Sequence, residues 1–197
     1  MKRSLSVYSI SVVSMFAALT AAGAFIKIPM PVIPFTLQIL FVYLAGALLG
    51  SKLGAMSQCL YIAIGLSGLP VFSSGGGLSY IFQPTFGYLM GFAAASFVIG
   101  YILERCNQPK LKHFLFAHFT GLIIVYLFGV GYLYLSLNTW IGTGISFGAA
   151  FYSGFLLSIF GDLLLCFGAS LLALRLFKSV RRPLEKGRVS YSGAAKG

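Results

Sequence analysis

The chain has 197 residues, of which 58% are hydrophobic and only 9% are charged. A soluble domain carries charge on about a quarter of its residues, so this composition excludes an ordinary soluble globule and indicates an integral membrane protein. The net charge of +11 comes from basic residues that lie between apolar runs, so it reflects membrane topology and does not indicate a nucleic-acid partner.

Six apolar segments are predicted to cross the lipid bilayer as helices. They run from Tyr8 to Ile26, Phe35 to Gly50, Leu53 to Leu66, Thr85 to Leu103, His113 to Ser136 and Phe147 to Phe177. We therefore predict an all-α integral membrane protein, with a compact bundle of six transmembrane helices over residues 1–177. Residues 178–197 are basic and contain Gly and Ser, and they are predicted to form a cytoplasmic tail that is disordered beyond Arg182.

The first apolar segment follows Met1-Lys2-Arg3 and has features of a signal peptide. Its length of about 19 residues is enough to span a bilayer and further spans follow, so we predict a retained helix. Ala17 and Ala21, and likewise Ala18 and Ala22, are four residues apart, which lets another helix approach closely. From the sequence alone, packing within this chain is the favoured role of these alanines.

Two segments rich in proline and glycine separate the apolar runs. The first, from Lys27 to Pro34, has three prolines in six residues and is predicted to be an extended loop. The second, from Gly68 to Phe92, is uncharged and contains Gly75, Gly76 and Gly77. Consecutive glycines beside a helix start can present N–H groups to a polar or anionic ligand. A flexible turn is an equally good interpretation of the glycine run taken alone.

The basic residues predict the orientation of the chain in the membrane. With the N-terminus in the cytoplasm, thirteen of the fourteen Lys and Arg residues lie on the cytoplasmic side, and Lys27 alone lies outside. This asymmetry follows the positive-inside rule and predicts that both termini are cytoplasmic. The proline-rich and glycine-rich loops then lie together on the outer face, where a ligand would arrive.

Asp162 is the only acidic residue inside a predicted span. A carboxylate at that depth costs about 2.5–3.5 kcal/mol on insertion scales, so it should face the bundle and have a partner. It is a candidate functional residue, and a structural hydrogen bond to a neighbouring helix is the alternative. Gln38 and Gln83 each lie close to an outer-face proline, where their amides could bind a neutral polar group.

Aromatic residues on the outer side offer walls for a ligand site. They are Tyr80, Tyr88, Tyr152 and Trp140, although Tyr and Trp are also common in the interfacial belt of membrane proteins. No spacing of Cys, His and acidic residues in the sequence suits a metal, and no nucleophile–base pattern or P-loop is present. The sequence therefore predicts no metal, no cofactor and no enzymatic activity.

Three stretches of the sequence, taken together, carry a family resemblance. They are IPMPVIPFTLQ from Ile28 to Gln38, GLPVFS from Gly68 to Ser73 with the glycines and PTFGYLMGF that follow, and Gly161-Asp162 in the last span. In these motifs, and in length and number of spans, the whole chain resembles the BioY family, the biotin-binding S subunits of energy-coupling-factor (ECF) transporters.

The resemblance implies a small six-helix subunit of the bacterial cytoplasmic (inner) membrane, which captures biotin from outside in a pocket under its first and third loops. Transport would then require an ECF coupling protein and two ATPase subunits, recruited partly through small residues on the first helix; Ala17, Ala18, Ala21 and Ala22 match that pattern. The expected substrate-binding residues are Lys27, Thr36, Gln38, Gly75, Gly76, Gly77, Tyr80, Gln83, Tyr88, Tyr152 and Asp162.

Two positions depart from the family pattern. Leu165 stands where a lysine usually follows the aspartate by three residues, and Gln83 stands where a glycine usually precedes Pro-Thr. Without that lysine, we expect Asp162 to accept a hydrogen bond from the ureido group of biotin and the biotin carboxylate to point outward, toward Lys27 or the glycine amides of residues 75–77. An S subunit for another vitamin or heterocycle and, from another class, a membrane-embedded enzyme are the alternatives.

Overall fold

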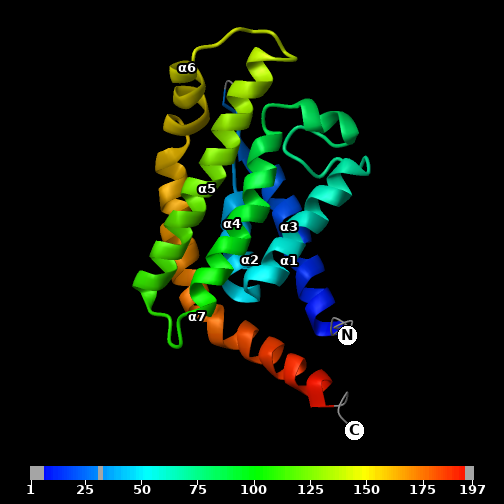
Figure 1. Ribbon diagram of the computed structural model, residues 1–197, viewed down its shortest axis with the longest axis vertical. Coiled ribbons are helices and arrows are strands. Elements are labelled where there is room, and N and C mark those ends of the chain that lie inside the picture. The colour runs from blue at the N-terminus through cyan, green and yellow to red at the C-terminus, as the bar shows by residue number, and fades with distance from the viewer. Residues whose placement is uncertain (1–6, 31–32, 194–197) are drawn as a thin grey trace.

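The computed structural model describes the backbone of residues 7–30 and 33–193, and side chains in the same ranges up to residue 181. The elements are almost all helical and lie alongside one another (Figure 1). In chain order they are α1 (Val7–Phe25), β1 (Lys27–Ile28), β2 (Phe35–Thr36), α2 (Gln38–Leu49), α3 (Ser51–Leu66), the 3-10 helix η1 (Leu78–Phe82), α4 (Phe86–Glu104), α5 (Leu111–Asn138), α6 (Phe147–Phe151), the π-helical turn η2 (Tyr152–Leu156) and α7 (Ile159–Gly193).

Within the described ranges, four helical segments are long and apolar enough to cross a membrane. They are α1, α4, α5 and residues 159–181 of α7, with 19, 19, 28 and 23 residues. The all-helical prediction and the membrane class are therefore supported by the structure. The second and third predicted spans are the shorter helices α2 and α3, of 12 and 16 residues, which are separated only by Gly50.

The sixth predicted span is wrong as a single continuous helix. The structure divides it into α6, the turn η2 and the start of α7. In η2 the N–H of Leu157 donates to the carbonyl of Tyr152, five residues earlier, over 3.3 Å. Such a π-turn interrupts the regular hydrogen-bond ladder of an α-helix, and π-turns are often found at functional sites. The segment is largely apolar on both sides of the break, so its composition did not predict the break.

Close contacts between helices hold the bundle together. Gly46 of α2 faces α4, and a Cβ atom at Gly46 would lie 2.6 Å from the backbone oxygen of Ser96. Gly100 of α4 faces the start of α3 in the same way, because a Cβ there would lie 2.2 Å from the backbone nitrogen of Ser51. These two glycines let the helix backbones approach as small residues do in membrane bundles.

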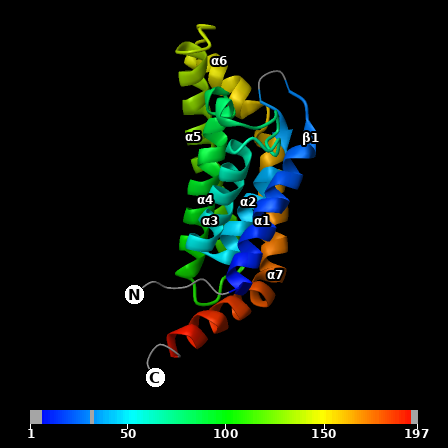
Figure 2. The same cartoon turned by 90° about the vertical axis from the view of Figure 1, so that its right-hand side faces the viewer.

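The two loops predicted to lie together do so. Strands β1 and β2 pair antiparallel, with Lys27 opposite Thr36, and the segment 67–85, which contains η1, lies at the same end of the bundle (Figures 1 and 2). The start of α1 and the end of α7 lie at the opposite end. This arrangement agrees with a ligand site formed under both loops.

The C-terminal segment differs from the prediction of a tail without regular structure. Helix α7 continues to Gly193 and leaves the bundle at an angle in Figure 1. Near the point of departure, Arg181 lies 3.7 Å from a carboxylate oxygen of Glu104, which ties α7 to the end of α4. The division into a bundle over residues 1–177 and a separate tail stays a prediction.

Candidate ligand-binding site

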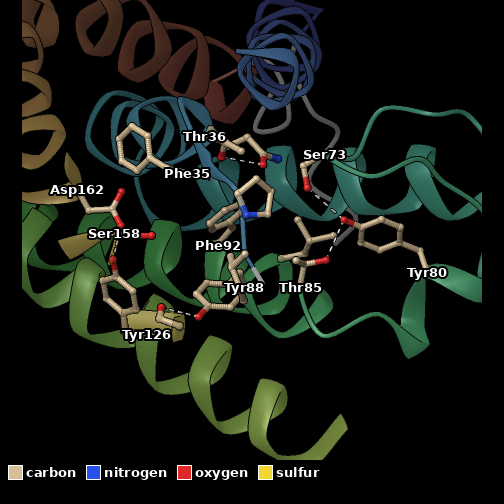
Figure 3. Close-up of a pocket in the computed structure, with 15 residues that line it drawn as sticks. Phe35, Thr36, Ser73, Tyr80, Thr85, Tyr88, Phe92, Tyr126, Ser158 and Asp162 are labelled. Carbon is tan, nitrogen blue, oxygen red and sulfur yellow. Dashed lines mark hydrogen bonds between the residues drawn. The ribbon is translucent and has the colours of Figure 1, made fainter. Parts of the chain in front are cut away.

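A cavity lies at the end of the bundle that carries the two loops (Figure 3). Its walls come from the β-hairpin segment, the loop before α4, and helices α2, α4, α5, η2 and α7. The aromatic residues that line it are Phe35, Tyr80, Tyr88, Phe92 and Tyr126. The polar side chains that line it belong to Thr36, Gln38, Ser73, Thr85, Ser158 and Asp162. An apolar site with a few placed polar groups is the usual design of a small-molecule pocket.

Asp162 is buried at the wall of this cavity, with 7% of its surface exposed. Its Oδ2 atom accepts a hydrogen bond from the hydroxyl group of Tyr126 on α5. The other carboxylate oxygen, Oδ1, has no hydrogen-bond partner among the described residues. Asp162 therefore has both the structural bond and the cavity position that the sequence presented as alternatives.

Gln38 also lines the cavity, but its amide group is engaged within the protein. Its Nε2 atom donates to the hydroxyl group of Tyr61 over 2.6 Å, and its Oε1 atom accepts from Thr36 Oγ1 over 3.0 Å. The Tyr61 hydroxyl in turn donates to the carbonyl of Val71 over 3.1 Å. This chain of bonds joins the hairpin, α2, α3 and the loop before α4, so Gln38 shapes the cavity wall through its neighbours.

Tyr80 belongs to a second polar group on the loop side of the cavity. Its hydroxyl accepts from Thr85 Oγ1 over 2.9 Å and lies 3.3 Å from Ser73 Oγ. Lys27 reaches this group from the hairpin, because its Nζ atom donates to the carbonyl of Ser73 over 2.5 Å. Lys27 itself is exposed and does not line the cavity, so it lies at the outer rim.

Tyr88 lines the cavity from α4 and is buried. Its hydroxyl group donates to the carbonyl of Gly154 in η2 over 2.7 Å. The ring lies against Gly129 of α5, where a Cβ atom would come within 2.4 Å of it. Tyr88 therefore contacts the helix break directly.

Six residues predicted for the site do not line the cavity, and Lys27 at its rim is one of them. Gln83 and Tyr152 are exposed, and Gly75, Gly76 and Gly77 lie away from it. Two of the glycine amides are used within the loop, because Gly75 N–H donates to the carbonyl of Phe72 and Gly77 N–H donates to that of Gly65. Gly75 and Gly77 have φ angles of 120° and 98°, a region that favours glycine, so they shape the turn.

The four alanines of α1 divide into two faces. Ala17 is in the core with 3% of its surface exposed, and Ala21 packs against the core. Ala18 and Ala22 are exposed on the outside of the bundle. Ala17 and Ala21 therefore pack within the chain, whereas Ala18 and Ala22 form a surface that is available to another helix.

Several lining residues were not identified from the sequence. Tyr126 is the most consequential, because it holds Asp162, yet nothing in its sequence surroundings distinguishes it from the other tyrosines of α5. Ser158 could have been found, since it lies four residues before Asp162 and shares its helix face. Phe35 and Phe92 belong to the motifs that carry the family resemblance, but they were not assigned to the site.

Comparison with known proteins places this architecture in a family. The BioY family model matches residues 1–182. A protein of Lysinibacillus sphaericus named "Probable biotin transporter BioY" is 54% identical over 92% of each chain. The "Biotin transporter BioY" of Thermotoga maritima is 38% identical over 83% of this chain and 92% of its own length. These relatives are named as transporters and not as enzymes.

A solved structure has the same fold. It is the crystal structure of the S-component for biotin from an ECF-type ABC transporter, which matches 89% of this chain and 96% of its own with a TM-score of 0.74 and 24% identity. The family match over nearly the whole chain and the extensive identity to curated relatives agree with the motifs in the proline-rich and glycine-rich loops. The chain belongs to the BioY family.

Proposed function

We propose that this protein binds biotin with high affinity and takes it up as the substrate-binding S component of an ECF-type transporter. The observation that carries the proposal is the carboxylate of Asp162, which is buried at the wall of a largely aromatic cavity with one oxygen held by Tyr126. Relatives named as biotin transporters and a fold shared with a biotin S-component support the identity of the ligand.

The ureido ring of biotin suits the inner part of the cavity. It is neutral and has two N–H donors, and Oδ1 of Asp162 is an acceptor without a partner among the described residues. A hydrogen bond to a carboxylate in a dry site is stronger than one between neutral groups. The ring system and the apolar chain of biotin then lie among the aromatic side chains, of which Phe35, Tyr88 and Phe92 line the same cavity.

The carboxylate of biotin is assigned to the outer rim. No Lys or Arg lines the cavity among the described residues, and Leu165 is a partly buried apolar residue packed against the core. Lys27 bonds to a residue that lines the cavity, because its Nζ atom donates to the carbonyl of Ser73. A carboxylate that leaves the cavity beside Ser73 meets Lys27 where water is close and desolvation costs less.

We place the protein in the bacterial cytoplasmic membrane with six crossings and both termini in the cytoplasm. The four long helices provide four crossings. Helices α2 and α3, which follow one another between α1 and α4, provide the other two. The segment α6 with η2 extends α7 toward the outer face. Apart from Lys27, the described basic residues then gather at the end opposite the cavity, as the positive-inside rule requires.

Energy for uptake comes from partner subunits in this proposal. The sequence holds no nucleotide-binding motif, so an ECF coupling protein and two ATPases would supply the energy. The exposed residues Ala18 and Ala22 on α1 offer the coupling protein a smooth helix surface.

Equilibrium binding of labelled biotin to the detergent-purified protein tests the proposal. We expect saturable binding at one site per chain that unlabelled biotin displaces and that riboflavin, thiamine and a deazapurine do not. Displacement by one of those compounds, with biotin inert, would assign the protein to another ligand. Asp162→Asn serves as the control that links the signal to the cavity.

A further inference from the structure

The helix break between α6 and α7 leaves one buried carbonyl without its usual donor. In a regular α-helix the N–H of Ser158 would bond to the carbonyl of Gly154, four residues earlier. Here Ser158 donates to Phe155 over 3.2 Å, and Leu157 donates to Tyr152 over 3.3 Å. Buried backbone carbonyls nearly always have a partner, so the Gly154 carbonyl needs a donor from outside its own helix.

Tyr88 supplies that donor. Its hydroxyl bonds to the Gly154 carbonyl over 2.7 Å, in a buried setting (Figure 3). Two glycines make room for it: a Cβ at Gly129 would lie 2.4 Å from the Tyr88 ring, and one at Gly154 would lie 2.8 Å from the hydroxyl oxygen. The ring edge also faces Tyr126, with centroids 6.3 Å apart at 82°. Tyr88 thus contacts both the helix break, at Gly154, and Tyr126, the residue that bonds to Asp162.

Two polar residues of the cavity lie at the end of this break: Ser158 is its last residue, and Asp162 lies in the first turn of α7. Ser158 and Asp162 lie one turn apart, with the N–H of Asp162 bonded to the carbonyl of Ser158 over 3.0 Å. The direction in which α7 starts, and so the direction of both side chains, depends on the conformation of residues 152–158. That conformation has the Gly154 carbonyl turned to Tyr88.

We infer that Tyr88 is a positioning residue, which holds the break between α6 and α7 so that Asp162 is aimed into the cavity. Its hydroxyl is already committed to Gly154 as a donor, so its main contribution to the ligand is made through Asp162. The inference rests on the proposed function, because the ligand that Asp162 binds is taken to be biotin. It goes further in that it assigns to Tyr88 a role other than direct polar contact with the ligand.

A double-mutant cycle measures this role. Biotin affinity is determined for the wild type, Tyr88→Phe, Asp162→Asn and the double variant, all as detergent-purified full-length protein. Tyr88→Phe keeps the ring over Gly129 and removes only the hydroxyl, and we expect about a tenfold loss of affinity, in the range for a hydrogen bond lost from a buried carbonyl. In the Asp162→Asn background the same change should cost less than about twofold, because residues that act through one another are not additive.

Tyr80→Phe is the matched control. Tyr80 lines the same cavity and is buried, but its hydroxyl bonds to Thr85 and Ser73 and not to the helix break. The change in biotin affinity caused by Tyr80→Phe should be the same with and without Asp162→Asn. Gly154→Ala should disrupt the same hydrogen bond, since the added methyl group displaces the Tyr88 hydroxyl. Its loss of biotin affinity should likewise be smaller in the Asp162→Asn background.

The outcomes separate the two proposals. If the wild type does not bind biotin, the proposed function fails. If the wild type binds and the losses from Tyr88→Phe and Asp162→Asn simply multiply, Tyr88 acts independently of Asp162 and the positioning role is overturned. The same conclusion follows if Tyr88→Phe binds biotin as well as the wild type, or if Asp162→Asn does.

Discussion

The hydroxyl group of Tyr126 on α5 donates a hydrogen bond to Oδ2 of Asp162 on α7. This single contact joins the two helices at the inner wall of the cavity and fixes which carboxylate oxygen is left for a ligand. A charge buried in a membrane protein is tolerated when it is paired or hydrogen-bonded, and Tyr126 provides that bond without adding a second charge. In the proposed complex with biotin, Oδ1 then remains as the acceptor for a neutral donor such as a ureido N–H.

Replacing Asp162 with Asn tests the contact with the ureido group. We expect biotin and its uncharged carboxyl-amide to lose affinity by a similar amount, about 1.5–3 kcal/mol, which is the usual value for a hydrogen bond to a charged group. The two ligands share the ureido ring and differ only at the far end. Calorimetric titration of both ligands provides the measurement, and unchanged affinity for both would make Asp162 a purely structural helix contact.

Replacing Lys27 with Ala tests the contact with the ligand carboxylate. Biotin should bind less tightly to this variant, whereas the carboxyl-amide should bind as it does to the wild type, because only the acid carries the charge that Lys27 would meet. The loss should shrink as salt is added, since Lys27 is exposed and its interaction is screened. Lys112→Ala, an exposed lysine at the other end of the bundle, is the control. Equal losses for acid and amide would instead show that the Lys27–Ser73 bond shapes the rim.

Replacing Ala18 or Ala22 with Leu tests the surface offered to a coupling protein. Both residues are exposed on α1, so the larger side chain should leave biotin binding to the purified subunit unchanged while uptake by cells that express the whole transporter falls. Ala17→Leu is the opposite case, because Ala17 is buried and overpacking a core costs about 1–3 kcal/mol of stability. Loss of binding and uptake in equal measure would mean that Ala18 and Ala22 pack within the subunit.

Replacing Tyr61 with Phe tests the bond chain behind Gln38. The change removes the acceptor of the Gln38 amide and the donor of the Val71 carbonyl, so buried polar groups lose their partners at about 1–3 kcal/mol. We expect a lower midpoint of thermal unfolding in detergent. Tyr101→Phe removes a hydroxyl whose hydrogen bond among the described residues comes from the exposed Arg105, just past the end of α4, and it should leave the midpoint unchanged. If both variants melt alike, the chain of bonds adds nothing to the stability of the cavity wall.

The sequence predicted the features of this protein that depend on local composition. Long apolar runs marked the helices, the prolines after Lys27 marked the hairpin loop, and the lone acidic residue Asp162 marked the cavity. The distribution of Lys and Arg predicted an outer end, and the two loops do lie at one end of the bundle.

The features that were missed depend on partners far away in the chain. The break in the last predicted span is completed by Tyr88, 66 residues before Gly154, and Asp162 is held by Tyr126, 36 residues before it. No local pattern encodes either pairing. The glycines of residues 75–77 misled for a related reason: flexible backbone can present N–H groups to a ligand or to its own loop, and here Gly77 donates to Gly65.

Helix α7 begins in the cavity wall and runs without a break to the opposite end of the bundle. From Asp162 to Arg181 an α-helix spans about 28 Å at 1.5 Å per residue. A continuous helix of this length is stiff along its axis, so it is not compressed when its first turn moves. A displacement of Asp162 along the helix axis must therefore be accommodated by the irregular segment before Ile159 or be transmitted through α7 to the Arg181–Glu104 contact at its other end.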